Sequence, residues 1–160
     1  MNSVRILLVE DEAPKCRHFE TFLERLGLNM VTTVSKSVNA ALDELDKGLP
    51  DLLLLDMSLP TFDIGGRENG GRPQGFGGIE VLRYMSMAGM ECPTIVITGY
   101  EAFQREAGKP IDLSGLRSEL VREFPTMFKG LLHYNSTYDE WKTALKNTLI
   151  DFGFGMEECN

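Results

Sequence analysis

The chain has 160 residues, a length that suits one globular domain with its own hydrophobic core. Hydrophobic residues make up 42% and charged residues 25%, which excludes the low-hydrophobicity composition of a disordered protein. The formal net charge of −8 argues against direct nucleic-acid binding, because phosphates are bound chiefly by clustered lysines and arginines. We expect a single domain over residues 1–160 with no direct contact to nucleic acid.

The N-terminal residues lack the charged, apolar and small-residue regions of a signal peptide, and no apolar run reaches membrane-spanning length. We therefore expect a cytoplasmic protein without membrane contact. The three cysteines, Cys16, Cys92 and Cys159, are too widely spaced for a disulfide framework or a zinc site. Reduced thiols are the expectation.

The first third of the chain alternates between strand and helix patterns. Nearly continuous apolar runs predict buried parallel strands at 4–9 and 52–55, and a looser alternation predicts another strand at 28–34. Between them, apolar residues recur at helical spacing over 19–26 and 38–45, and each stretch is followed by a glycine that can end a helix.

A Gly-rich segment interrupts the pattern after the third strand. Residues 61–78 are rich in glycine and polar residues and predict a long loop, either a plain flexible insertion or a lid over a site at its start. Helical spacing resumes over 79–85, and an apolar run predicts a fourth strand at 94–97.

The segment 99–129 is long for one crossover. It predicts two helices, a short one over about 100–107 and a second over about 116–124 that ends before a proline. A last strand at 130–134 and a final helix over 141–149 complete the chain. The repeated strand–helix order predicts a doubly wound α/β fold.

Polar residues follow each of the three central strands. They are Glu10-Asp11-Glu12, Asp56-Met57-Ser58 and Thr98-Gly99. Because the carboxyl ends of neighbouring parallel strands meet at one edge of a sheet, these groups should form one pocket. Crowded carboxylates repel one another, and a Mg²⁺ ion with oxygen ligands would relieve the repulsion. Asp56 could then act as a nucleophile toward a phosphoryl donor, with Thr98 donating a hydrogen bond to a phosphoryl oxygen.

Each of these signals has an ordinary structural interpretation when it is taken alone. The acidic run could be a solvated helix start, Asp56 the first residue of a loop, and Thr98-Gly99 a turn. Their joint occurrence at three strand ends favours a site. His18 and His133 have no partners at metal-ligand spacing and are interpreted as surface or packing residues.

Four segments together resemble the receiver domains of two-component response regulators: ILLVEDE at 6–12, LLLLDMSLP at 52–60, GIEVLRYM at 78–85 and TIVITGY at 94–100. The resemblance covers nearly the whole chain apart from the two long segments. It implies a five-stranded parallel sheet of order 2-1-3-4-5 with helices on both faces.

The resemblance also implies roles for individual residues. Glu10 and Asp11 match the family's acidic pair, with Asp11 the more direct metal ligand, and Asp56 matches the phosphorylated aspartate. The backbone carbonyl of Ser58 matches a further metal ligand, and Thr98 matches the switch hydroxyl.

One position departs from the family, whose members usually carry a lysine followed by proline at the tip of the fifth strand. Here Tyr134 takes the lysine position, Asn135 the proline position, and Leu131 the place of an aromatic switch residue. A substitute ammonium could come from Lys109 or Lys129.

These features predict a stand-alone phosphoryl-accepting switch rather than an enzyme. A histidine kinase or phosphotransfer protein would phosphorylate Asp56, and a downstream protein would bind the altered surface. A degenerate receiver that binds partners without phosphorylation is the alternative, favoured by Tyr134. A small phosphohydrolase is disfavoured because Asp56-Met57-Ser58 lacks the second aspartate that such hydrolases use for acid–base chemistry. A flavin mononucleotide carrier is disfavoured because the acidic cluster would repel its phosphate.

Overall fold

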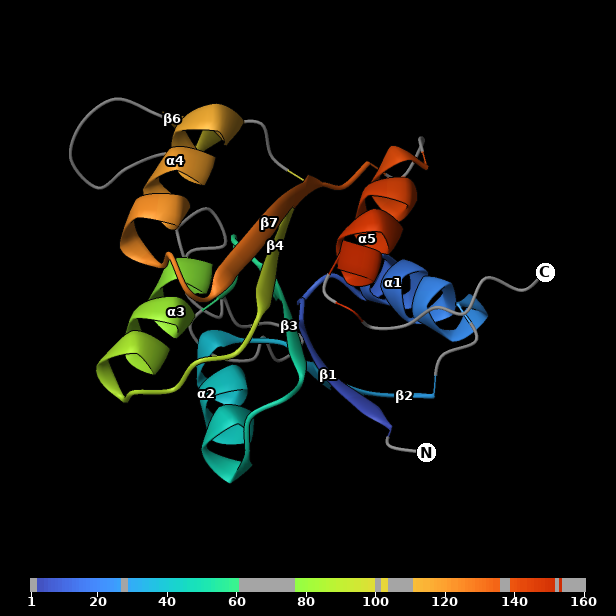
Figure 1. Ribbon diagram of the computed structural model, residues 1–160, viewed down its shortest axis with the longest axis horizontal. Coiled ribbons are helices and arrows are strands. Elements are labelled where there is room, and N and C mark those ends of the chain that lie inside the picture. Colours follow the sequence, from blue (N-terminus) through green and yellow to red (C-terminus); the bar gives the residue numbers. More distant parts are fainter. Residues whose placement is uncertain are drawn as a thin grey trace, which may run out of the picture.

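A five-stranded parallel sheet with helices on both faces forms the centre of the computed structural model (Figure 1). The structure describes residues 3–26, 29–60, 77–99, 102–103, 111–135, 139–151 and 153. The elements in chain order are β1 (Val4–Val9), α1 (Ala13–Arg25), β2 (Met30–Ser35), α2 (Val38–Lys47), β3 (Leu52–Asp56), α3 (Gly77–Met87), β4 (Thr94–Thr98), β5 (Ala102–Phe103), β6 (Ile111–Asp112), α4 (Leu113–Glu123), β7 (Phe128–His133) and α5 (Glu140–Asp151).

The main sheet has the order β2-β1-β3-β4-β7, and every neighbouring pair is parallel. Since β7 is the fifth strand of this sheet, the order is the predicted 2-1-3-4-5. The doubly wound fold class is confirmed.

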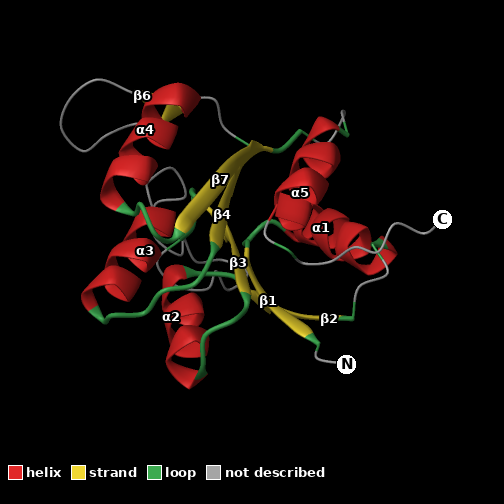
Figure 2. Cartoon of the chain, in the orientation of Figure 1, coloured by secondary structure: helices red, strands yellow, loops and turns green. Residues whose placement is uncertain are grey.

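Two hydrophobic cores lie on opposite faces of the sheet (Figure 2). Helices α2, α3 and α4 pack on one face, and α1 and α5 pack on the other. Alternate residues of each strand serve the two cores: Leu7 and Leu53 face the first, whereas Leu8 and Leu54 face the second. Burial on both faces explains why the central strands are continuous apolar runs.

The segment 99–129 differs from its prediction in the first half. The helix predicted over about 100–107 is wrong at residues 102–103, which form β5 and pair antiparallel with β6. The side chain of Asp112 caps α4 by accepting a hydrogen bond from the Gly115 N–H at 2.8 Å, so the chain just before the cap is extended and offers a strand edge. The second predicted helix is confirmed as α4.

The predicted Gly-rich loop falls largely outside the described residues, as 61–76 are not among them. Its last two residues were assigned to the loop wrongly, because Gly77 and Gly78 are the first residues of α3. A Cβ on Gly77 would lie 2.4 Å from the Leu59 carbonyl oxygen, and one on Gly78 would lie 2.6 Å from the Asp56 carbonyl oxygen. The glycines let α3 pack directly against the backbone that follows β3.

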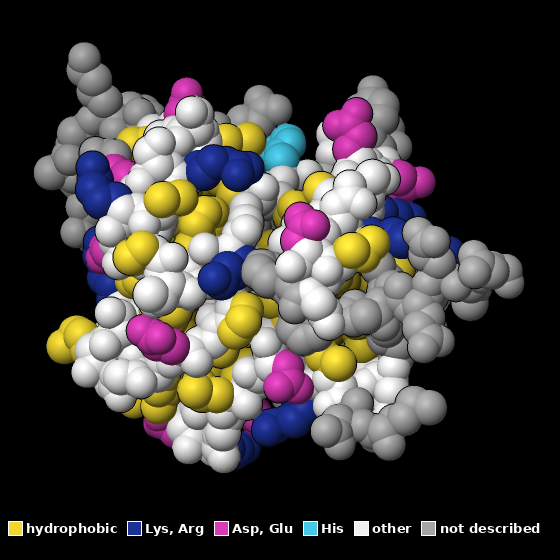
Figure 3. Space-filling model, viewed as in Figure 1, with side chains coloured by type: hydrophobic (Ala, Val, Ile, Leu, Met, Phe, Trp, Pro, Cys, Tyr) yellow, Lys and Arg dark blue, Asp and Glu magenta, His cyan; other side chains and the backbone are white. Residues whose placement is uncertain are grey.

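None of the helices in the described part of the chain is long and apolar enough to cross a membrane. On the face seen in Figure 3, acidic and basic side chains are interspersed with apolar ones, and no continuous basic surface forms.

Gly78→Ala should lower the free energy of unfolding by about 1 to 3 kcal/mol, because the new methyl group meets backbone atoms that cannot rotate away. Chemical denaturation measures the loss. Gly130→Ala is the matched control, since its Cβ would meet only Thr148 side-chain atoms at 3.8 Å or more. Equal stability of the two variants would contradict the close approach of α3.

Candidate functional site

Three carboxylates meet at the carboxyl ends of β1 and β3. Val9 pairs with Leu55 in the sheet, so the next residues, Glu10 and Asp56, leave their strands at the same level. One carboxylate oxygen from each of Glu10, Asp11 and Asp56 lies within 4.8 Å of the others. Glu10 is only 2% exposed and Asp56 only 4%, so two of the three are almost fully buried.

The cluster holds its negative charges at an energetic cost. Burial, followed by the charge of Asp56, raises the pKa of Glu10 from 4.5 to about 8. Burial also raises the pKa of Asp56 and that of Asp11. The Ser58 backbone N–H and the charge of Lys15 oppose the rise at Asp56. Without a metal, the cluster therefore favours an added proton.

A buried lysine lies among these carboxylates. The Nζ atom of Lys15 lies 2.6 Å from Glu10 Oε2 and 3.3 Å from Asp56 Oδ1, and the residue is 4% exposed. Burial alone would lower the pKa of Lys15, but the charges of Asp56 and Glu10 raise it overall, so the group is an ammonium. One ammonium offsets only part of the charge of three carboxylates.

Helix geometry brings Lys15 to the strand tips. Helix α1 begins at Ala13, directly after the acidic run, with Pro14 in its first turn. Side chains in a helix lean toward its N-terminus, so a lysine in the first turn reaches back over the ends of β1 and β3.

Lys15 was not among the predicted site residues, although its position in the sequence carries a signal. It stands four residues before Phe19 and eight before Leu23, both of which are buried on α1. Those intervals place all three residues on one helix face. A charged residue on the buried stripe of the helix that follows an acidic cluster indicates a buried ion pair.

The other predicted site residues lie at the same edge of the sheet. Ser58 and Thr98 are buried, and Thr98 is the last residue of β4. His133 pairs with Thr98 across β4 and β7, and the Tyr134 N–H donates to the Thr98 carbonyl oxygen at 2.7 Å. Tyr134 therefore lies at the tip of the fifth strand of the sheet, the position at which the family resemblance places it.

Lys109 and Lys129 were suggested as sources of a substitute ammonium, and the structure tests one of them. Lys129 is exposed near the amino end of β7, five residues before Tyr134, which places it ~16 Å along the strand from the site. That suggestion is wrong, because a lysine at the opposite edge of the sheet cannot reach Asp56. Lys109 lies outside the described residues.

Tyr134 belongs to an aromatic cluster between α1 and α5. Its ring lies 5.6 Å from the ring of Phe19 and 5.4 Å from that of Trp141, and its hydroxyl is hydrogen-bonded to His18 Nδ1. The Lys15 Nζ lies 5.6 Å from the centroid of the Tyr134 ring, within cation–π range. The tyrosine thus contacts the ammonium from the strand tip where the family usually has a lysine.

A family model described as the response regulator receiver domain matches residues 6–114. The chain belongs to this family. Its sequence is 30% identical over 145 residues to the Detocs response regulatory protein DtcB of Enterobacter cloacae (strain JD6301), covering 89% of this chain and 95% of the relative. It is also 25% identical to the uncharacterized protein y4jR of Sinorhizobium fredii (strain NBRC 101917 / NGR234), covering 92% and 97%.

Solved structures show the same receiver fold. The signal receiver domain of an HD domain-containing protein from Pseudomonas fluorescens Pf-5 matches with a TM-score of 0.64 at 18% identity, covering 94% of each chain. The response regulator protein TrrA of Thermotoga maritima, in complex with Mg²⁺-BeF, matches with a TM-score of 0.57 at 20% identity, covering 91% of this chain and 99% of TrrA.

The acidic cluster of this receiver domain suits a hard divalent cation. Glu10, Asp11 and Asp56 offer carboxylate oxygens, the donor type that Mg²⁺ prefers, and burial raises the pKa of each, so a cation beside them would stabilise their charged forms. The predicted fourth ligand, the backbone carbonyl of Ser58, follows Asp56 by two residues. The residues present fit a Mg²⁺ site.

Metal-free stability should depend on pH through Glu10. Its pKa is about 8 in the folded chain against an ordinary 4.5, so the folded state binds more protons between these values. The additional proton on Glu10 stabilises the folded state. This contribution to the free energy of unfolding is fully present below about pH 4.5 and is lost as pH rises to 8, at up to about 1.4 kcal/mol per pH unit.

Thermal and urea denaturation in chelator from pH 5 to 8 measures this slope. Glu10→Gln removes the titrating group and should flatten the profile. A variant whose profile matches that of the unmodified protein would show that Glu10 does not hold the additional proton.

Proposed function

We propose that this receiver domain is a phosphoryl-accepting switch of a two-component phosphorelay, with Asp56 as the acceptor. The observation that carries the proposal is the placement of Asp56. It ends the central strand β3, beside the carboxylates of Glu10 and Asp11 and 3.3 Å from a buried ammonium. A phosphoryl-transfer site requires a nucleophile with positive charge beside it for the phosphoryl oxygens. Here Asp56 is the nucleophile, the ammonium supplies positive charge, and the neighbouring carboxylates can bind a metal ion that supplies more.

The proposed step forms an aspartyl phosphate. One carboxylate oxygen of Asp56 forms a bond to the phosphorus of a phosphohistidine donor, while the bond from phosphorus to the donor's imidazole nitrogen breaks. The electron pair of that bond leaves with the imidazole, which takes a proton from solvent. Asp56 must be anionic for this attack.

Mg²⁺, when bound, supplies positive charge for the phosphoryl oxygens and orients the donor. Glu10, Asp11, Asp56 and the Ser58 carbonyl would hold it. A structural neighbour with this fold, TrrA, was solved in complex with Mg²⁺-BeF, which supports a Mg²⁺ site in this domain. Thr98, buried at the end of β4, would donate its hydroxyl to a phosphoryl oxygen.

The partners in this proposal are a histidine kinase or phosphotransfer protein upstream and a protein that binds the altered receiver surface downstream. The domain itself is an acceptor and not an enzyme. Its only turnover is slow hydrolysis of its own aspartyl phosphate.

A second candidate is a degenerate receiver that binds partners without phosphorylation. One observation favours it, namely that Tyr134 and not a lysine stands at the tip of β7. The complete acidic cluster and the buried Lys15 favour the phosphorylated switch.

Incubation with acetyl phosphate and Mg²⁺ should add the mass of one phosphoryl group to the intact protein, because Asp56 can attack this small acyl phosphate in the same way. Chelation of Mg²⁺ should abolish the addition. Asp56→Asn keeps the shape of the side chain but removes the nucleophile, so it should remain unmodified.

Asp43→Asn is the charge-matched control, since Asp43 is exposed on α2 away from the site. It should be phosphorylated like the unmodified protein. An adduct that survives in Asp56→Asn, or no adduct in the unmodified protein, would contradict the proposed switch, and the second result would favour the degenerate receiver.

A further inference from the structure

The family's usual ammonium is missing from the strand tip, and a different ammonium lies in the site. We propose that Lys15 contacts a phosphoryl oxygen on Asp56, in the role that the fifth-strand lysine has elsewhere in the family. This inference rests on the proposed function. In this chain the ammonium comes from the first turn of α1, and Tyr134 occupies the tip of the fifth strand.

The contacts of Lys15 already match the role. Its Nζ lies 3.3 Å from Asp56 Oδ1, the carboxylate that would carry the phosphoryl group. The second partner, Glu10 Oε2 at 2.6 Å, holds the ammonium at the carboxyl ends of β1 and β3. Because both contacts are made by one atom, a small movement away from Glu10 can bring the ammonium to a new negative group on Asp56.

Burial argues against an alternative role as a surface charge. Lys15 is 4% exposed, in contrast to Lys47, whose side chain is 71% exposed beside Glu44. An ion pair in such a buried place is not retained for surface solubility, and its charge is weakly screened by salt.

Tyr134 supports the ammonium and could not replace it. Its ring lies 5.6 Å from Lys15 Nζ, and its hydroxyl is held by His18, one turn further along α1. A phenol carries no positive charge at neutral pH, so it cannot compensate a phosphoryl group. The positive charge beside Asp56 therefore comes from Lys15 of α1, and the uncharged Tyr134 at the tip of β7 packs against it.

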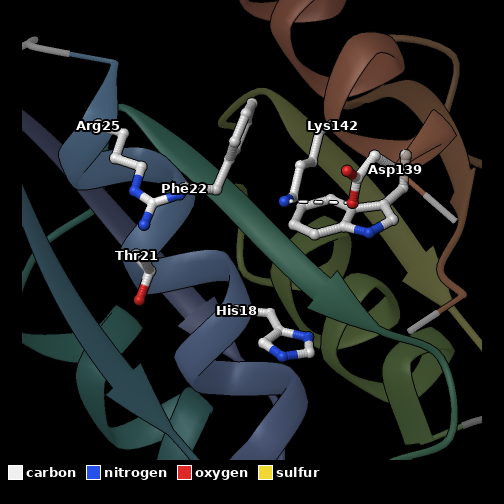
Figure 4. A pocket seen from close by; sticks show the side chains of 7 residues that line it. His18, Thr21, Phe22, Arg25, Asp139 and Lys142 are labelled. Atoms are coloured by element: carbon white, nitrogen blue, oxygen red, sulfur yellow. Dashed lines mark ion pairs between the residues drawn. The ribbon is translucent and has the colours of Figure 1, made fainter. Parts of the chain in front are cut away.

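This arrangement predicts which part of the domain changes when Asp56 is phosphorylated. Lys15 and Tyr134 both touch the α1–α5 side of the domain, where the Tyr134 ring lies 5.4 Å from that of Trp141. A groove of about 300 Å³ between α1 and α5 is lined by Trp141 and by His18, the hydrogen-bond partner of the Tyr134 hydroxyl (Figure 4). Phe22 of α1 and Lys142 of α5 are among its lining residues. Movement of the ammonium should change the environment of Trp141, the single tryptophan of the chain.

Beryllofluoride with Mg²⁺ is the probe, and Trp141 fluorescence reports its binding. Lys15→Met should bind it about ten- to a hundredfold more weakly, because a charge-assisted hydrogen bond is lost. The double variant Lys15→Met with Tyr134→Lys should recover at least part of the affinity, since it returns an ammonium to the strand tip. Lys36→Met removes an exposed lysine just after β2 and should bind like the unmodified protein.

Circular dichroism checks that each variant folds. If Lys15→Met does not fold, ¹⁵N NMR of the lysine side chains in the unmodified protein decides, where the buried ammonium signal should shift on addition of beryllofluoride. Unchanged affinity in folded Lys15→Met, an unshifted ammonium signal, or a loss that Tyr134→Lys does not restore would overturn the assignment of Lys15. No binding by the unmodified protein would instead overturn the proposed function.

Discussion

The structure depends on the buried charge cluster at the carboxyl ends of β1 and β3. Two carboxylates, Glu10 and Asp56, are almost completely removed from water, and Lys15 lies between them. Removing one partner of a buried ion pair typically costs about 3 to 5 kcal/mol, because the remaining charge has lost its hydration. The cluster is therefore stable only as a set that includes positive charge from Lys15, a proton or a metal ion.

That constraint organises the rest of the site. The first turn of α1 must begin immediately after the acidic run for Lys15 to reach Asp56, and Gly78 at the start of α3 lets that helix pack against the backbone of Asp56. With the ammonium supplied by α1, the tip of β7 can carry a large aromatic residue. Tyr134 uses that freedom to pack against Phe19 and Trp141, which connects the site to α5.

The sequence predicted most of the fold because its signals were long or repeated. Strand order and the convergence of Glu10, Asp56 and Thr98 followed from buried apolar runs and from a resemblance that covers most of the chain. The helix predicted over about 100–107 is wrong at 102–103, because a few apolar residues at helical spacing are a weak signal and pairing with β6 overrides it there.

Lys15 was missed for a different reason. In the family pattern the ammonium lies at the end of the fifth strand, so sequence reasoning places a substitute lysine close to that strand along the chain. The lysine that reaches the site, Lys15, stands 119 positions before Tyr134 in the sequence. The spacing of Lys15 from Phe19 and Leu23 places it on the buried face of α1, and the packing of α1 on the sheet brings it to Asp56.

The most direct test of this account is a crystal structure of the protein with Mg²⁺ and beryllofluoride bound at Asp56. We predict Lys15 Nζ within about 3 Å of a fluorine atom, the range of a charge-assisted hydrogen bond, with Tyr134 still at the tip of β7. A structure in which Lys15 remains paired with Glu10 alone, and another group or only water meets the fluorine atoms, would contradict it.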